Sequence, residues 1–398
     1  MDPPPMVEQP TAAATGVEAR AWLAAIVGTV SVAFPAFLTG AITVQLKDDL
    51  GLSATEIGVA IAASFAAAAA ASYRLGQLAE RMGPQAALRL ALATSAATML
   101  AIAAFVQHAW SLTSLLALAG VANGLAQPAA NLLLATAVPA RRLGLAMAAK
   151  QSGVPGGALL GGVAVPALAL TVGWRWAFVG GAALALAVIA VPPRVGRVNI
   201  SRRAPATPDL STRLLTMYSL VGMLGAAAAG SLVAFLTAGA ERSGIDAGAA
   251  GLLLSSGALV GISVRLVQGW EVDRRQFRPI VRVVVLMTIG AACFAALAVD
   301  RSGFYLAFTL PTFAFGWSWP GLLNLSVIRN NPSAPGAATG TTQTGVYIGA
   351  AAGPAIAGLT VDAVGYGALW FGCAIALAAS AVVARVLAGQ MARLRSPI

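Results

Sequence analysis

The chain has 398 residues, of which 58% are hydrophobic and only 10% are charged, and its net charge is +11. Soluble domains carry about 25% charged residues, so this composition excludes a soluble globular protein and indicates an integral membrane protein. The positive charge is spread over the short segments between apolar runs and accompanies no element that reads a nucleic-acid groove, which argues against nucleic-acid binding.

Twelve uncharged runs follow one another along the chain, each at or near the length that crosses a bilayer as a helix. A helix is expected because lipid offers the backbone no hydrogen-bond partners and because the runs lack the alternation of a strand. The first six runs are residues 22–46, 57–73, 90–107, 109–140, 151–174 and 176–193. The second six are residues 214–240, 247–264, 283–299, 302–328, 330–361 and 363–384.

The second half of the chain repeats the first at an offset of 192 residues. Residues 151–154 read Gln-Ser-Gly-Val and recur as Gln-Thr-Gly-Val at 343–346, and the same offset pairs Pro128 with Pro320. A repeat of this length predicts two similar six-helix bundles that face each other across a cleft. The expected organisation is an N-terminal tail (1–20), a first bundle (21–193), a linker (194–213), a second bundle (214–388) and a C-terminal tail (389–398).

The distribution of Lys and Arg predicts the orientation in the membrane. Most of the 25 basic residues fall on the side of the two tails, and those expected in loops on the other side are Lys47, Arg175, Arg242 and Arg301. Because basic loops remain in the cytoplasm, both termini are expected there, in a membrane of the bacterial inner-membrane type. The first 20 residues lack the basic start and short apolar core of a signal peptide and are expected to be a tail.

The segment between the second and third runs, residues 76–83, reads Gly-Gln-Leu-Ala-Glu-Arg-Met-Gly. It resembles the signature loop of the major facilitator superfamily, and residues 269–274 keep a weaker copy. The resemblance implies an all-α fold of twelve transmembrane helices in two pseudo-symmetric six-helix bundles, and transport by alternating access. An acid and an Arg in such a loop hold neighbouring helices together in one state. The latch residues expected on this basis are Gly76, Glu80, Arg81 and Gly83, with Asp273 and Arg274 in the second copy.

Polar residues of the fourth run are the first candidates for a transport cavity. Asn123, Gln127 and Asn131 are spaced four apart and therefore share one helix face. In hydrocarbon such a stripe either bonds to a neighbouring helix or lines a water-filled cavity. The family arrangement favours the cavity, because there the first, fourth, seventh and tenth helices border it.

A single cation, Lys150, is expected about seven residues, or roughly 10 Å, into the fifth span. Its charge either snorkels to the headgroups or anchors an anionic substrate, and both interpretations stay open. Gln151 would complete such an anion site, and the repeat-related Gln343 would approach from the other bundle. The aromatic and polar candidates of the second bundle are Trp317, Asn324 and Tyr347, with core packing as their alternative role.

All 14 Asp and Glu residues fall in tails, in loops or at span ends, so an organic cation has no obvious counter-ion and no proton relay is indicated. One His and two Cys indicate neither a metal site nor a cofactor and argue against an enzyme. The sequence therefore predicts a monomeric transporter of a small organic molecule, with a preference for an organic anion or carboxylate. Efflux of apolar drugs or metabolites is the alternative, while a co-transported ion and a non-transporting receptor stay open.

Glycines spaced every four residues occur in the fifth and eleventh helices, where they predict close helix packing. These glycines are Gly153, Gly157 and Gly161, and their repeat-related counterparts Gly345, Gly349 and Gly353.

Overall fold

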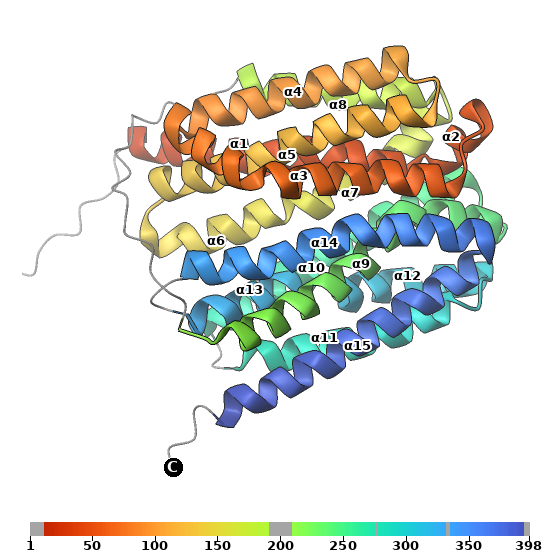
Figure 1. Cartoon of the computed structure of the whole chain (residues 1–398). Helices are drawn as coiled ribbons and strands as arrows, with labels where there is room; N and C mark the ends of the chain where they lie inside the picture. Colours follow the sequence, from red (N-terminus) through yellow and green to blue (C-terminus); the bar gives the residue numbers. More distant parts are fainter. Residues whose placement is uncertain (1–11, 191–208, 275–276, 332–334, 394–398) are drawn as a thin grey trace, which may run out of the picture.

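The computed structural model describes residues 12–190, 209–274, 277–331 and 335–393, and every regular element in them is a helix. Residues 1–11 of the expected N-terminal tail, 194–208 of the linker and 394–398 of the C-terminal tail lie outside the described residues. The described helices pack as two bundles, one above the other in Figure 1.

The first bundle contains six crossings. They are α1 (Ala12–Ala41) continued by α2 (Thr43–Leu50), α3 (Ala54–Met82), α4 (Pro84–Phe105), α5 (Ala109–Ala137), a composite of α6 (Ala140–Gln151), α7 (Gly153–Ala164) and the π-helix η1 (Val165–Ala169), and α8 (Trp174–Ala190). The α1 helix begins ten residues before the expected first run, within the segment expected to be a tail.

The second bundle repeats this plan. Its crossings are α9 (Thr212–Arg242), α10 (Ala247–Arg274), α11 (Pro279–Leu297), a composite of α12 (Ser302–Pro311), the π-helix η2 (Thr312–Gly316) and α13 (Pro320–Arg329), α14 (Pro335–Ala363) and α15 (Tyr366–Arg393). The described residues contain 10 candidate spans that are long and apolar enough to cross a membrane. The shorter α8 and the composite of α12, η2 and α13 complete the twelve crossings.

Several helices extend beyond the uncharged runs, so a charged residue does not mark the end of a helix. The fifth crossing begins at Ala140, and α10 continues past residue 264 to Arg274. Long basic side chains can reach a polar environment while their backbone stays helical. Consequently Lys150 lies ten residues, or about 15 Å, from the start of its helix, which is deeper than expected.

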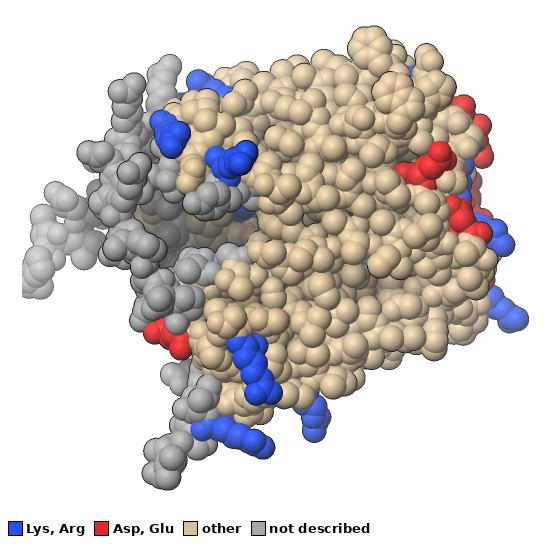
Figure 2. Space-filling model, viewed as in Figure 1, with Lys and Arg blue, Asp and Glu red and all other residues tan. Residues whose placement is uncertain are grey.

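Charged side chains gather at the two ends of the molecule (Figure 2). Between them, the face shown carries a broad belt of uncharged residues, as a chain surrounded by lipid requires. We call the end where α1 begins and α15 ends the terminal face, and the other end the opposite face. In Figure 2 the surface is hollowed between the two bundles toward the terminal face.

The glycines of α7 and α14 pack as the sequence predicted. A Cβ on Gly349 would overlap the backbone carbonyl of Met223 in α9, and one on Gly353 would come within 2.3 Å of the carbonyl oxygen of Ala227. In the first bundle, Gly153 packs against α1, where a Cβ would come within 2.8 Å of the carbonyl oxygen of Ile26. The fifth crossing therefore packs on the first crossing as the eleventh packs on the seventh, which is the pairing that the internal repeat requires.

Near the opposite face, hydrogen bonds join the two bundles directly. Thr237 of α9 donates to the carbonyl oxygen of Gly40 at 3.2 Å, and Thr43 donates to that of Ala234 at 3.2 Å. Ser255 of α10 donates to the carbonyl oxygen of Leu159 in α7 at 2.8 Å. These bonds close the opposite half of the boundary between the bundles.

Candidate substrate-binding site

Lys150 lies in the last turn of α6 and is buried, with 1% of its surface exposed. Its Nζ donates a hydrogen bond to Oε1 of Gln127 in α5. The Nε2 of Gln127 in turn donates to Oδ1 of Asn123, one turn earlier, at 3.0 Å. The amine is thus directed along the α5 stripe instead of toward the headgroups.

The α-helical hydrogen bonds are interrupted beside Lys150. Ser152 separates α6 from α7, and Gly153 and Pro155 follow immediately. Pro155 has no N–H for the helical ladder, so a break in this position follows from the sequence. The break places the end of α6 against both α1 and α5, where the Lys150 side chain reaches Gln127.

The charge of Lys150 is not balanced by a nearby acid in the part of the chain that the structure describes. The ion pairs found there join Glu18 to Arg142 and Glu271 to Arg282. A buried charge whose partners are neutral amides keeps much of its desolvation cost. Lys150 is therefore a buried cation that has no anionic partner among the described residues.

The other polar residues predicted from the first bundle lie beside this network and take no part in its two hydrogen bonds. Asn131 continues the α5 stripe one turn beyond Gln127 and is exposed, and Gln151 follows Lys150 and is also exposed. Asn123 and Gln127 are half-buried. The structure thus brings together three of the five predicted residues of the first bundle.

A second cation, Arg265 of α10, lies inside a helix that crosses the membrane, and the sequence reasoning missed it. Its Nη2 donates to the carbonyl oxygen of Trp317 at 2.5 Å, and its guanidinium carbon stands 5.2 Å from the centre of the Trp317 ring. The missed signal was the apolar sequence that resumes directly after Arg265, as Leu266 and Val267. The expectation of one intramembrane cation was therefore wrong.

Trp317 occupies the irregular segment between η2 and α13, where the tenth crossing is interrupted. The carbonyl oxygen of Trp317 has no helical partner there, and Arg265 supplies one. The ring is 7% exposed and contacts Phe313 and, across the bundle boundary, Phe37, with centroids 5.3 and 6.2 Å away. Phe37 also meets Phe65 of α3, so an aromatic cluster joins the two bundles.

The remaining candidates of the second bundle stand apart from the Lys150 network. Gln343 and Tyr347 lie on α14, whose main neighbours are α9 and α3. Asn324 lies on α13, the helix that directly follows the interruption at Trp317. All three are half-buried.

The predicted latch loop forms a tight turn between α3 and α4. Gly83 has φ +85, a conformation that suits glycine, and Pro84 opens α4. Gly76 and Arg81 belong to the last turns of α3, and Arg81 is exposed. The side chains of Glu80, Asp273 and Arg274 lie outside the described residues. In the second copy the described ion pair instead joins Glu271 to Arg282.

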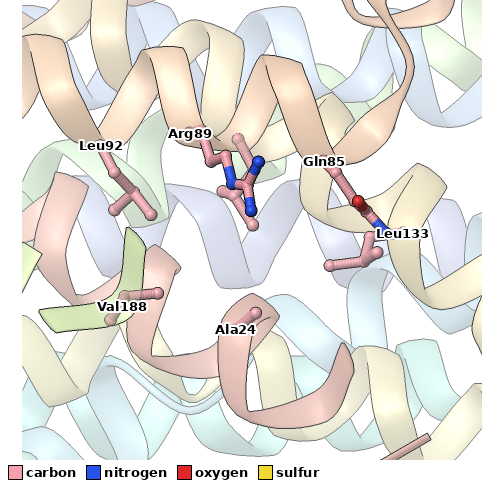
Figure 3. Close-up of a pocket in the computed structure, with 7 residues that line it drawn as sticks. Ala24, Gln85, Arg89, Leu92, Leu133 and Val188 are labelled. Carbon is pink, nitrogen blue, oxygen red and sulfur yellow. The ribbon is translucent and has the colours of Figure 1, made fainter. Parts of the chain in front are cut away.

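A small, mostly apolar pocket lies within the first bundle and is distinct from this site. Figure 3 shows the Arg89 side chain projecting among its lining residues, which come from α1, α4, α5 and α8: Ala24, Gln85, Leu88, Arg89, Leu92, Leu133 and Val188. The pocket does not lie on the boundary between the bundles. A rocking motion of the bundles would therefore not expose it first to one side of the membrane and then to the other.

Sequence comparison decides the family. The model of the Major Facilitator Superfamily matches residues 24–342, which is well over half of the chain. The chain belongs to this superfamily. Its membership agrees with the twelve crossings and the two repeated bundles, and it places the protein among multi-pass membrane transporters rather than enzymes.

Two kinds of transporter resemble this superfamily member in sequence. The gallate transporter of Pseudomonas putida is 30% identical over 199 residues, covering 48% of this chain and 44% of that protein. Multidrug resistance protein MdtG of Dickeya zeae (strain Ech586) is 39% identical over 121 residues, covering 30% of this chain and 29% of that protein. Each match therefore spans less than half of the relative.

A solved structure resembles the whole fold. It is a bacterial homologue of the human lysosomal transporter Spinster, in an inward-facing and unoccupied conformation. The alignment covers 96% of both chains with a TM-score of 0.68 at 13% sequence identity. At that identity the likeness shows the superfamily fold alone.

Proposed function

We propose that this protein is a secondary transporter that moves a small organic anion, a carboxylate, across the membrane by alternating access. The observation that carries the proposal is the buried Lys150, whose amine is bonded to the neutral Gln127. A carboxylate would offset the desolvation cost of this cation. No acidic residue in the described part of the chain pairs with Lys150.

The neighbouring amides suit the same ligand. Gln127 and Asn123 each carry an amide NH₂ group with two donors, and the bond between them uses one donor, from Gln127. Their remaining donors can bind carboxylate or hydroxyl oxygens. The similarity to a gallate transporter supports this substrate class, because gallate is a carboxylate on a hydroxylated aromatic ring.

The contacts between the bundles suggest which conformation of the transport cycle this structure represents. Bonds near the opposite face hold the bundles together there, while the surface is hollowed toward the terminal face (Figure 2). We infer that the terminal face is cytoplasmic, as the excess of Lys and Arg predicts, and that this conformation opens inward. The protein would function as a monomer in a bacterial inner membrane.

Uptake by purified protein in sealed liposomes tests the function. Gallate and benzoate are offered to wild type, Lys150→Met and Lys150→Arg, with Arg142→Gln as a control that removes an exposed cation of the same helix. Wild type and the control should accumulate a carboxylate. The uptake rate of Lys150→Met should be lower by about tenfold or more, because a contact between a buried charge and its ligand contributes more than about 1.4 kcal/mol to binding. Equal uptake by Lys150→Met would contradict the role of Lys150.

Efflux of apolar drugs is the second candidate, supported by the similarity to MdtG and by the aromatic cluster of Phe37, Phe65, Phe313 and Trp317. Aromatic side chains give large apolar contacts to organic ligands. Transport of uncharged aromatic compounds at equal rates in wild type and Lys150→Met would favour this function. Binding of a ligand without transport into sealed vesicles would indicate a receptor.

A further inference from the structure

We propose that Arg265 is the second cationic contact of the substrate, so that one carboxylate bridges Lys150 of the first bundle and Arg265 of the second. The inference rests on the proposed function and adds to it a specificity-determining residue on the opposite bundle. Three observations carry it: the depth of Arg265, its unused donors and its attachment to the interrupted tenth crossing.

The packing of α7 on α10 sets the relative depth of the two cations. These helices run antiparallel, and Ser255 bonds to the carbonyl oxygen of Leu159 at 2.8 Å. From this contact, Lys150 lies nine residues back along the fifth crossing and Arg265 lies ten residues forward along α10. At 1.5 Å per residue both are about 14–15 Å from it, toward the terminal face. Helices α6 and α10 are in contact, so the two cations lie at one depth on neighbouring helices.

The guanidinium of Arg265 has hydrogen-bonding capacity left. A guanidinium has five N–H donors, and the bond to Trp317 uses one of them. The Nε of Arg265 is buried and has no hydrogen-bond partner among the described residues. Both ion pairs in the described part of the chain involve other arginines. A planar carboxylate fits the parallel donors of such a group better than it fits an ammonium.

Attachment to Trp317 gives the contact a mechanical consequence. Arg265 holds the carbonyl oxygen of the interrupted segment and stacks on the Trp317 ring, and that ring touches Phe37 of the first bundle. Two like charges at one depth repel each other, and an anion between them turns that repulsion into attraction. Substrate binding would therefore draw α6 and α10 together and favour closure of the terminal side around the ligand.

Binding of benzoate to the purified full-length protein tests this assignment, with benzamide as a neutral compound of the same shape. The variants are Arg265→Gln, Arg265→Lys and Lys150→Met, and Arg278→Gln removes an exposed charge from the start of α11 as a control. Arg265→Gln should raise the Kd for benzoate about tenfold or more. Its binding of the neutral benzamide should stay unchanged. The melting temperature of the control Arg278→Gln should also stay unchanged. The Kd of Arg265→Lys for benzoate should lie between those of wild type and Arg265→Gln, because Lys keeps the charge but lacks the parallel N–H donors of the guanidinium.

The outcomes separate the two proposals. If Lys150→Met loses benzoate and Arg265→Gln binds it as wild type does, the role of Arg265 is overturned and the anion function stands. If benzoate and gallate fail to bind the wild type, the anion function itself fails. Should Arg265→Gln not fold, Arg265→Lys decides: a wild-type Kd overturns the assignment, and a raised Kd at an unchanged melting temperature supports it.

Discussion

Thr55, at the start of α3, donates its backbone N–H and its hydroxyl to Oδ2 of Asp362, near the end of α14, at 2.7 and 2.6 Å. Oδ1 of Asp362 also accepts from the N–H of Ala54 at 3.2 Å. The carboxylate of one bundle thus caps the N-terminus of a helix in the other, where free N–H groups and the helix dipole favour negative charge. This cap lies at the opposite face and helps to hold it closed.

Removing the carboxylate should open the opposite face. We expect Asp362→Ala to weaken the closed state by about 1–2 kcal/mol, which changes the open population roughly 5- to 30-fold. The measurement is labelling of Thr237→Cys, whose native side chain is buried between α9 and α1, with an impermeant maleimide in a background without Cys293 and Cys373. Labelling from the opposite face should accelerate by that factor.

Asp246 provides a matched control for this experiment. It accepts hydrogen bonds from the N–H groups of Gly248 and Ala249 at 2.9 and 3.2 Å, so it caps α10 from within the same bundle. Asp246→Ala removes the same type of cap and should leave the labelling rate of Thr237→Cys near that of the parent. Equal acceleration by both substitutions would mean that Asp362 acts on general stability and not on the boundary between the bundles.

Close packing of α14 on α9 should make Gly349 intolerant of a side chain. A Cβ there would overlap the backbone carbonyl of Met223, which cannot move independently of its helix. We expect Gly349→Ala to lower the free energy of unfolding by about 1–3 kcal/mol. In α15, a Cβ on Gly372 meets nothing within 4 Å, so Gly372→Ala should be neutral or stabilising. Thermal unfolding in detergent compares the two, and similar losses in both would argue against the packing explanation.

The fold could be predicted from the sequence because its determinants are local and repeated. Apolar length predicted the crossings, and the 192-residue offset predicted the two bundles and the equivalent glycine contacts of Gly153 and Gly345. The ends of helices were predicted less well. The rule that a charge ends a span fails where a long side chain finds a partner inside the protein, as Arg265 does at Trp317.

The candidate site shows the same division. The spacing of Asn123 and Gln127 predicted a shared face, and the structure joins them by a hydrogen bond. The equal depth that we infer for Arg265 and Lys150 depends on the register between α7 and α10, where Ser255 contacts Leu159. Such a register between bundles leaves no periodic signal in either helix, so the sequence pattern does not reveal it.

Arg175 should stabilise the opposite face of the first bundle. Its Nη1 and Nη2 donate to the carbonyl oxygens of Ala103 and Val106 at 2.8 and 2.9 Å, which satisfies acceptors at the end of α4. Its guanidinium also lies 4.5 Å from the centre of the Trp174 ring. We expect Arg175→Met to lower the free energy of unfolding by about 1–3 kcal/mol, measured by thermal unfolding.

Arg301 offers the comparison for Arg175. It is an exposed residue immediately before α12, and replacement of an exposed side chain away from specific contacts changes stability by about 0.5 kcal/mol or less. A loss in Arg301→Met as large as that in Arg175→Met would show that the effect comes from net charge and not from the capped carbonyls.

The ion pair between Glu271 and Arg282 links the end of α10 to the start of α11, and Arg282 also stands 4.9 Å from the centre of the Phe277 ring. Their side chains are 20% and 39% exposed, so solvent screens the pair only in part. A double-mutant cycle of Glu271→Gln and Arg282→Gln should give a coupling of about 0.5–1 kcal/mol in thermal unfolding. The same cycle on Glu18 and Arg142, which are 3.4 Å apart with Arg142 52% exposed, should give a smaller value.

A pair that serves as a latch should, in addition, change the transport rate when broken, because it holds one state of the cycle. A coupling in stability with unchanged uptake would therefore identify a structural contact and leave the latch role of this loop without support.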